Sequence, residues 1–158
     1  MYEVGNHLVH PMYGAGIVKD IISNESDDGG AGTCYCVSFP SWKIEMTVPV
    51  CKCDCVGIRY VIDKSEIQKV LDVLSEESDE MNANWNKRYR ENTDRMHSGD
   101  ICEVAAVVRN LSRRHRLKPL STGEKKLLIM AKQILESELA CSGGYTIEEV
   151  DELVESCI

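Results

Sequence analysis

The sequence lacks several features that would assign it to a class at once. No apolar run approaches the roughly 20 residues of a membrane-spanning helix. Met1-Tyr2-Glu3 opens the chain without the basic and then apolar stretches of a secretory signal. Internal repeats and extended low-complexity segments are also missing. We therefore expect a cytoplasmic protein that makes no contact with a membrane.

Catalytic patterns are missing too. The sequence contains neither HExxH nor GxSxG, and its four histidines, at positions 7, 10, 97 and 115, fall in different predicted elements. The Gly14-x-Gly16 pair lacks the third glycine and the Lys-Ser/Thr of a phosphate-binding loop, so it predicts a turn that leads into a strand. A cysteine nucleophile paired with a histidine stays open, but nothing singles one out. We predict a protein that is not an enzyme, has no cofactor and takes no small-molecule substrate.

The cysteine spacing of common zinc sites is absent as well. The eight cysteines include Cys51, Cys53 and Cys55, and Cys34 and Cys36 would join them from a preceding strand. Structural zinc sites use C-x₂₋₄-C pairs rather than C-x-C-x-C, and a reducing cytoplasm disfavours disulfides. Free thiols that act as small apolar side chains, with no metal bound, are the favoured interpretation. A metal or redox sensor is the alternative.

What the sequence does contain is typical of a globular protein with one core or two small ones: 158 residues, 43% hydrophobic and 28% charged. The formal net charge is −8, yet residues 84–126 carry 11 Lys+Arg against 5 Asp+Glu. The total charge argues against non-specific nucleic-acid binding by the whole chain, and its distribution favours one local surface that contacts an anion.

The first 60 or so residues predict short strands separated by turns. Apolar-rich runs cover residues 8–10, 17–22 and 34–39, and apolar side chains alternate with polar ones over residues 43–48. A polar stretch at residues 23–33 predicts a hairpin loop. These features predict a small, strongly bent antiparallel sheet or barrel.

After residue 61 the apolar period changes from two to about 3.6, which predicts helices and a domain boundary near Ile62. Asp63 or Ser65 would cap the first helix, and the acidic residues 75–80 predict a solvated connection. Further helices are expected over about residues 84–96 and 101–114, then after the capping boxes that start at Ser121 and Thr146. We predict an α+β protein with a sheet domain at residues 1–62 and an all-helical domain at residues 63–158.

Three helical segments supply the basic residues. In Asn84-Trp85-Asn86-Lys87-Arg88-Tyr89-Arg90, helical spacing places Trp85, Tyr89 and the later Met96 near one side, with cations beside them. Lys125 and Lys126 fall in a first helical turn, where the helix dipole disfavours cations, which hints at an anionic partner. An indole among these cations would stack on or wedge between bases; the alternative is a core tryptophan with a solvated basic face. The residues predicted to bind DNA are Trp85, Lys87, Arg88, Arg90, Arg114, Lys125 and Lys126.

Four segments, in this order, make the sequence resemble the CarD/CdnL family of bacterial transcription factors, whose N-terminal domain is shared with the transcription-repair coupling factor. They are Val4-Gly5 through His10-Pro11-x-x-Gly14-Ala15-Gly16; Thr47-Val48-Pro49 with Val56-Gly57-Ile58-Arg59; Asn84-Trp85-x-x-Arg88-Tyr89 with Ser98-Gly99-Asp100; and Val104-Ala105-x-Val107-Val108-Arg109-x-Leu111 through Leu120-Ser121-x-Gly123-Glu124-Lys125.

The resemblance implies a Tudor/SH3-like N-terminal domain that binds the β subunit of RNA polymerase. In the family an exposed strand extends a sheet of the polymerase lobe, so that backbone hydrogen bonds carry affinity and alternate side chains carry selectivity. The matching residues here are Ile44, Glu45, Met46, Thr47, Val48 and Pro49.

The resemblance also implies a helical C-terminal domain that contacts promoter DNA, without sequence specificity, at the upstream edge of the transcription bubble. Trp85 matches the family's tryptophan, which inserts into the minor groove there, and Lys87, Arg88 and Arg90 match its basic neighbours. Departures from the family pattern are Glu25 and Thr47, where members often place arginine in the polymerase-facing hairpin or strand, and Trp42 with the cysteine run.

These observations predict a transcription regulator that bridges polymerase and promoter, stabilises the open complex and associates with the nucleoid through polymerase. A free-standing nucleic-acid-binding protein that ignores polymerase is one alternative, and the cysteine-based sensor is the other.

Overall fold

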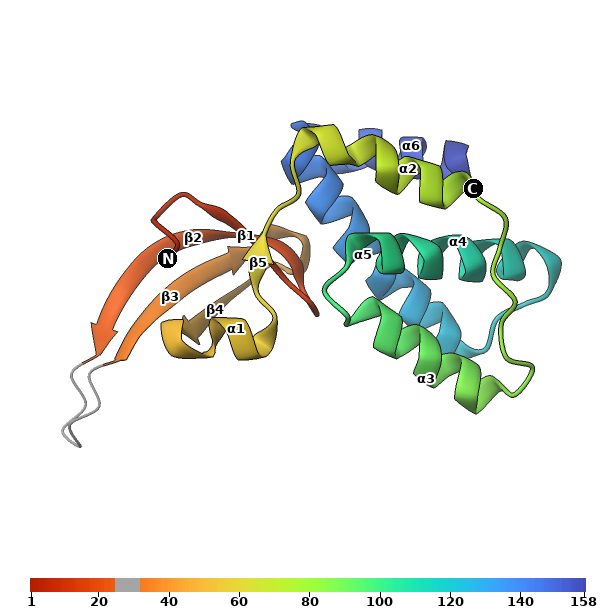
Figure 1. The fold of residues 1–158 in the computed structure, drawn as a ribbon, viewed down its shortest axis with the longest axis horizontal. Coiled ribbons are helices and arrows are strands. Elements are labelled where there is room, and N and C mark those ends of the chain that lie inside the picture. Colours follow the sequence, from red (N-terminus) through yellow and green to blue (C-terminus); the bar gives the residue numbers. More distant parts are fainter. Residues whose placement is uncertain (25–31) are drawn as a thin grey trace.

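The computed structural model describes residues 1–24 and 32–158. A five-stranded antiparallel sheet forms one end of the molecule and a group of helices forms the other (Figure 1). The predicted α+β class and the small N-terminal β domain are confirmed. Glu25 and most of the expected hairpin loop lie outside the described residues. None of the helices in the described part of the chain is long and apolar enough to cross a membrane.

The spatial order of the strands in the sheet is β4-β3-β2-β1-β5. The strands are β1 (His7–His10), β2 (Gly14–Asn24), β3 (Gly32–Phe39), β4 (Ile44–Pro49) and β5 (Arg59–Tyr60). A register shift between Val18 and Asp20 marks a bulge in β2, and bulges bend and twist a strand. The curvature of β2 and β3 in Figure 1 fits this bend and the predicted bent sheet.

The concave side of the sheet holds its own apolar cluster, built on Leu8, Val18, Tyr35, Val37 and Phe39. The sequence did not indicate the short helix α1 (Cys53–Val56), which follows β4 and places Cys53 in this cluster. Four residues are too few to show a helical period in a sequence.

The helical part has a second and larger apolar cluster. Its helices are α2 (Ile67–Ser75), α3 (Trp85–Met96), α4 (Ile101–Leu117), α5 (Thr122–Gly143) and α6 (Ile147–Cys157). Capping boxes at Ser121 and Thr146 are confirmed, and Gly144 ends α5 with a φ of 70°. α4 runs to Leu117 rather than to about residue 114. The backbone becomes extended at Lys118, because helical geometry is disfavoured in the residue before a proline, here Pro119.

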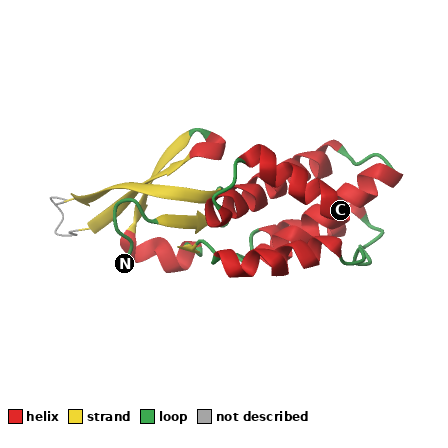
Figure 2. Ribbon diagram, turned by 90° about the horizontal axis from the view of Figure 1, so that it is seen from above, coloured by secondary structure: helices red, strands yellow, loops and turns green. Residues whose placement is uncertain are grey.

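One joint fixes the sheet against the helices. The Arg59 guanidinium forms two bonds with the Glu138 carboxylate, of 2.6 and 2.8 Å, and its Nε donates to the Gly99 carbonyl. The Ala15 N–H donates to Ser137 Oγ at 3.0 Å, and a Cβ on Gly14 would collide with the same hydroxyl. α5 therefore packs directly on β2, and the two parts hold a defined spacing. Figure 2 shows the strands and the helices meeting end to end.

Candidate nucleic-acid interface

Trp85 is the first residue of α3 and projects into solvent. The Asn84 side chain caps the helix by accepting hydrogen bonds from the N–H groups of Asn86 and Lys87, at 3.0 and 3.2 Å. The Trp85 side chain is 56% exposed and Tyr89, one turn later, is 37% exposed. A large exposed indole on a mostly acidic protein is unusual for a residue that serves only packing.

The inner face of α3 differs from the prediction. Arg88, Asn92 and Met96 are buried, so only Met96 of the expected apolar side faces the core. These three residues are spaced four apart and lie in one row of the helix, whereas Trp85 and Tyr89 form the neighbouring row. The predicted helix is present, but its inward-facing row contains an arginine. A buried carboxylate neutralises the charge of this arginine.

That carboxylate belongs to Glu124 in the first turn of α5. Arg88 Nε lies 2.6 Å from Glu124 Oε1, and the other end of the guanidinium donates to the carbonyls of Asn82 and Ala83. Burial alone would raise the pKa of Glu124, but the bonds from Arg88 and Ser121 outweigh it and hold the pKa below its usual value. Because Arg88 is 5% exposed and is held in this ion pair, the structure favours a role in the fold over a direct contact with a phosphate.

Several other cations of the basic segment also serve the fold. Arg95 bonds to Asp79 and Glu103, Arg109 to Asp79, and Arg116 to Glu155. Arg113 donates to backbone carbonyls of residues 74 and 76. The remaining cations, which form no ion pair with a described carboxylate, are Lys87, Arg90, Arg114, Lys118, Lys125 and Lys126.

Four of these six cations lie on α3 or in the first turn of α5. Lys87 and Arg90 are exposed on α3 itself, and Lys125 and Lys126 are exposed on α5. The first turn of α5 lies against Tyr89, because a Cβ on Gly123 would stand 3.6 Å from that ring. The structure therefore brings an indole, a phenol and cations from two helices to one region.

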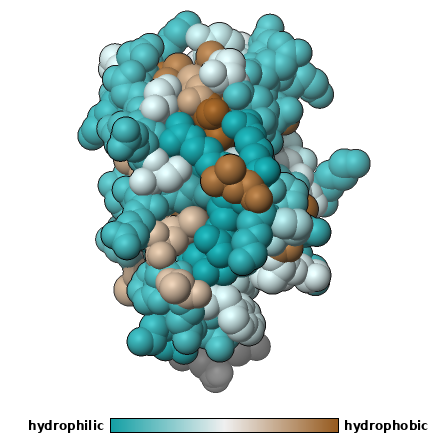
Figure 3. All heavy atoms as spheres, turned by 90° about the vertical axis from the view of Figure 1, so that its right-hand side faces the viewer, coloured by the Kyte–Doolittle hydropathy of each residue, from teal (hydrophilic) through white to brown (hydrophobic). Residues whose placement is uncertain are grey.

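Arg114 lies elsewhere on the helical part. It is half-buried and lines a groove of about 390 Å³ with Ser78, Met81, Leu117 and Lys118, between α4 and the segment that leads to α3. Figure 3 shows the end of the molecule where α3 begins and α4 ends, with a mostly hydrophilic surface and isolated hydrophobic side chains. That Arg114 binds DNA together with Lys125 and Lys126 stays a prediction.

The strand β4 forms one edge of the sheet, since it pairs only with β3, from Cys34 opposite Pro49 to Phe39 opposite Ile44. Its side chains alternate as expected, with Glu45 and Thr47 exposed and Val48 buried. An edge strand leaves backbone N–H and C=O groups unpaired and available to another strand.

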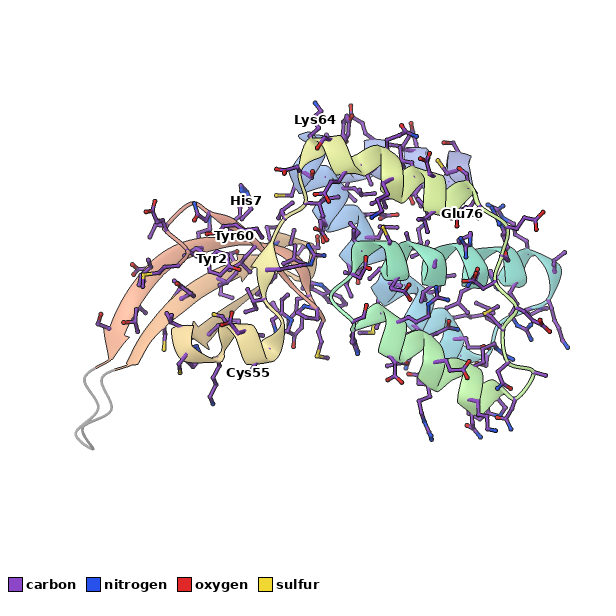
Figure 4. All side chains as sticks on the ribbon, viewed as in Figure 1. Tyr2, His7, Cys55, Tyr60, Lys64 and Glu76 are labelled. Atoms are coloured by element: carbon purple, nitrogen blue, oxygen red, sulfur yellow. The ribbon has the colours of Figure 1, made fainter. Side chains whose placement is uncertain are left out.

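The opposite edge is much shorter. β5 has two residues, and the Tyr2 ring covers it by packing 4.6 Å from the Tyr60 ring, as the labelled side chains in Figure 4 show. The long edge at β4 is thus the better template for an added strand among the described residues.

The cysteines bear on the alternative of a metal or redox sensor. All eight are free, and the described residues contain no group of three His, Cys, Asp or Glu side chains placed to hold a metal. Burial raises the pKa values of the Cys53, Cys102 and Cys141 thiols, which disfavours the reactive thiolate. Cys51 and Cys55 are exposed at the two ends of the run, and Figure 4 labels Cys55 on α1.

Comparison with known proteins assigns the class. The family description "CarD, C-terminal domain" matches residues 69–155, more than half of the chain, and "CarD-like/TRCF RID domain" matches residues 2–62. The chain therefore belongs to the CarD family, and this kinship assigns it to the transcription regulators. It is 31% identical over 150 residues to a Bacillus subtilis (strain 168) protein named "Putative transcription factor YdeB", covering 95% of this chain and 97% of that protein.

Proposed function

We propose that this protein binds the RNA polymerase β subunit through β4 and places Trp85 in promoter DNA at the upstream edge of the bubble, stabilising the open complex. The observation that carries the proposal is the exposed Trp85 at the start of α3, on a helix that also bears Lys87 and Arg90, which form no ion pair with a carboxylate of the described residues. Membership in the CarD family and the free edge at β4 support it.

The energetics are adequate for this task. A factor that binds the open complex better than the closed one shifts their equilibrium by its difference in affinity. Stacking of one base on an aromatic side chain is worth about 1–3 kcal/mol, and each phosphate contact adds a salt-dependent term. No base-specific contact is needed, so one protein would act at many promoters.

The residues proposed to contact DNA are those of the basic segment whose side chains reach the surface. Trp85 is the wedge; Lys87, Arg90, Lys125 and Lys126 neutralise nearby phosphates, and Arg114 extends this surface. For polymerase, the proposed contact is the outer edge of Ile44–Pro49. The two parts that bring these surfaces together are proposed as domains at residues 1–62 and 63–158, each with its own apolar cluster.

Two measurements test the proposal. Retention of the protein on an isolated β-subunit lobe is expected, whereas a free-standing nucleic-acid-binding protein would not be retained. Open-complex lifetimes on one unstable and one stable promoter should both increase when the protein is added. Unchanged lifetimes on both promoters would overturn the proposal.

A further inference from the structure

Arg88 and Glu124 form the contact that joins the two helices of the proposed DNA surface. Their side chains are 6% and 3% exposed and meet at 2.6 Å. Removal of one member would leave the other as an uncompensated buried charge, so such a pair holds its two elements together strongly.

Each residue of the pair is tied to a different part of that surface. Arg88 also donates to the carbonyls of Asn82 and Ala83, at 3.1 and 3.4 Å, and so anchors the segment that delivers Trp85. Glu124 accepts from the N–H and the hydroxyl of Ser121 and so closes the capping box of α5. Lys125 and Lys126 follow Glu124 directly.

We infer that the Arg88–Glu124 pair positions Trp85 relative to Lys125 and Lys126, and that Arg88 acts on DNA only through this placement. Burial supports the indirect role, because Arg88 is 5% exposed and directs its Nε and one terminal nitrogen to Glu124 and to two backbone carbonyls. The directed fork of an arginine suits this task better than a lysine, whose ammonium is a point charge on a flexible stem.

The inference rests on the proposed function, and a matched pair of variants separates the two. Arg88→Met and Arg90→Met each remove one cation from α3, but Arg88 is buried while Arg90 is exposed. The salt dependence of DNA binding distinguishes a phosphate contact from a positioning role, since each neutralised phosphate contributes about 0.9 to the slope of log K against log salt.

For Arg90→Met we expect the salt slope to fall by about one. For Arg88→Met we expect an unchanged slope together with a roughly three- to tenfold loss of the open-complex lifetime enhancement, because a displaced wedge loses its differential affinity. Arg88→Lys should restore only part of the loss. A fall of the slope by about one in Arg88→Met would overturn the inference, since it would make Arg88 a direct phosphate ligand.

Loss of folding in Arg88→Met is controlled by Arg88→Met/Glu124→Met, which removes both charges and leaves no buried carboxylate alone. We expect this double variant to unfold near the wild-type temperature yet to keep the lifetime defect. A double variant with wild-type lifetime enhancement would contradict a positioning role.

A readout without DNA keeps the inference separate from the proposed function. In a Trp42→Phe background, Trp85 is the remaining indole, and its quenching by acrylamide reports its surroundings. Both Arg88 variants should change the quenching constant, while Arg90→Met should not. If wild-type protein failed to extend any open complex but the quenching changed as expected, the proposed function would fall and the positioning role would stand. Unchanged quenching in both Arg88 variants would overturn the positioning role itself.

Discussion

Trp85 and Arg88 stand three positions apart on α3 and have opposite surroundings. The indole, which is apolar, is 56% exposed, and the guanidinium, which is charged, is 5% exposed. General rules of burial predict the reverse. The exposed indole therefore needs a partner to explain it, and the buried guanidinium has one in Glu124.

Lys125 and Lys126 allow a direct test of the phosphate contacts. Both are exposed in the first turn of α5, where the helix dipole disfavours a cation. Lys125→Gln/Lys126→Gln should reduce the salt slope of DNA binding by about two and leave thermal stability equal or slightly higher. The measurement is a set of binding isotherms between low and moderate salt. A weaker affinity that is the same at all salt concentrations would instead indicate a folding defect.

Glu136 provides a prediction that is independent of DNA. It is 8% exposed, and one carboxylate oxygen has no hydrogen-bond partner. Burial raises the pKa of Glu136 to about 7. The nearby Asp151 adds to this rise, and the attraction of Lys132 opposes it. Between pH 4.5 and 7 the folded protein therefore holds more protons at this site than the unfolded chain, so stability falls as pH rises through that range.

Glu136→Gln removes this ionisation. We expect the variant to be more stable than wild type by about 1–3 kcal/mol at pH 8 and to differ little at pH 5, because each pKa unit corresponds to about 1.4 kcal/mol. Urea unfolding at the two pH values is the measurement. The control is Glu152→Gln, at an exposed position in the middle of α6, and it should change neither value. A difference from wild type that is the same at pH 5 and pH 8 would contradict the account of Glu136.

Among the elements, those with local sequence signals were predicted best. The capping boxes at Ser121 and Thr146, the glycine stop of α5 and the alternation in β4 all involve residues within a few positions of one another. The pairing of Arg88 with Glu124 joins residues 36 positions apart. The sequence marked Glu124 as a capping residue but contained no local signal for its second partner.

The same reasoning applies to the candidate site as a whole. Exposure of Trp85, Lys87 and Arg90 agrees with what a contact surface requires, while the roles of Arg95, Arg109 and Arg113 in the fold depend on carboxylates and carbonyls of residues 74–79 and 103. A charge count over residues 84–126 cannot separate the two groups, because it treats every cation alike. The partners of each side chain in the folded structure divide them.

β4 can be tested as an element. Thr47→Pro removes a backbone N–H group that a partner strand would use. Backbone groups two residues apart point to the same side of a strand, and at Pro49 the sequence already has a residue without an N–H group. We expect loss of retention on the β-subunit lobe with the fold intact by circular dichroism. The control is Thr47→Ala, which changes the same side chain but keeps the backbone N–H group. Full retention of the Thr47→Pro protein would show that polymerase binds another surface.

At the scale of the whole molecule, the joint between sheet and helices sets the distance from β4 to Trp85. Glu138 is fully buried and accepts hydrogen bonds from both Arg59 and the Ile62 N–H. Ser137 and Ser142 add bonds to Ala15 and Ile62. A fixed spacing matters because a wedge attached to polymerase acts at one place on the promoter only if its carrier is rigid.

Glu138→Gln tests this coupling. It weakens the bonds to Arg59 and is expected to lower stability by about 1–3 kcal/mol, the usual cost when one partner of a buried charged hydrogen bond is altered. Lobe retention and DNA binding should each persist, while the open-complex lifetime enhancement falls. If all three properties stayed at wild-type values, the joint would have no part in function.

The measurement that tests the central claim most directly is the open-complex lifetime with Trp85→Ala beside wild-type protein, at equal occupancy of polymerase. Loss of a stacking wedge worth about 1–3 kcal/mol predicts that the lifetime falls by roughly 5- to 150-fold relative to that with wild-type protein, or to the lifetime without any factor if that limit is reached first. Retention on the β-subunit lobe should be unchanged. An open complex that lasts as long with Trp85→Ala as with wild type would contradict the account.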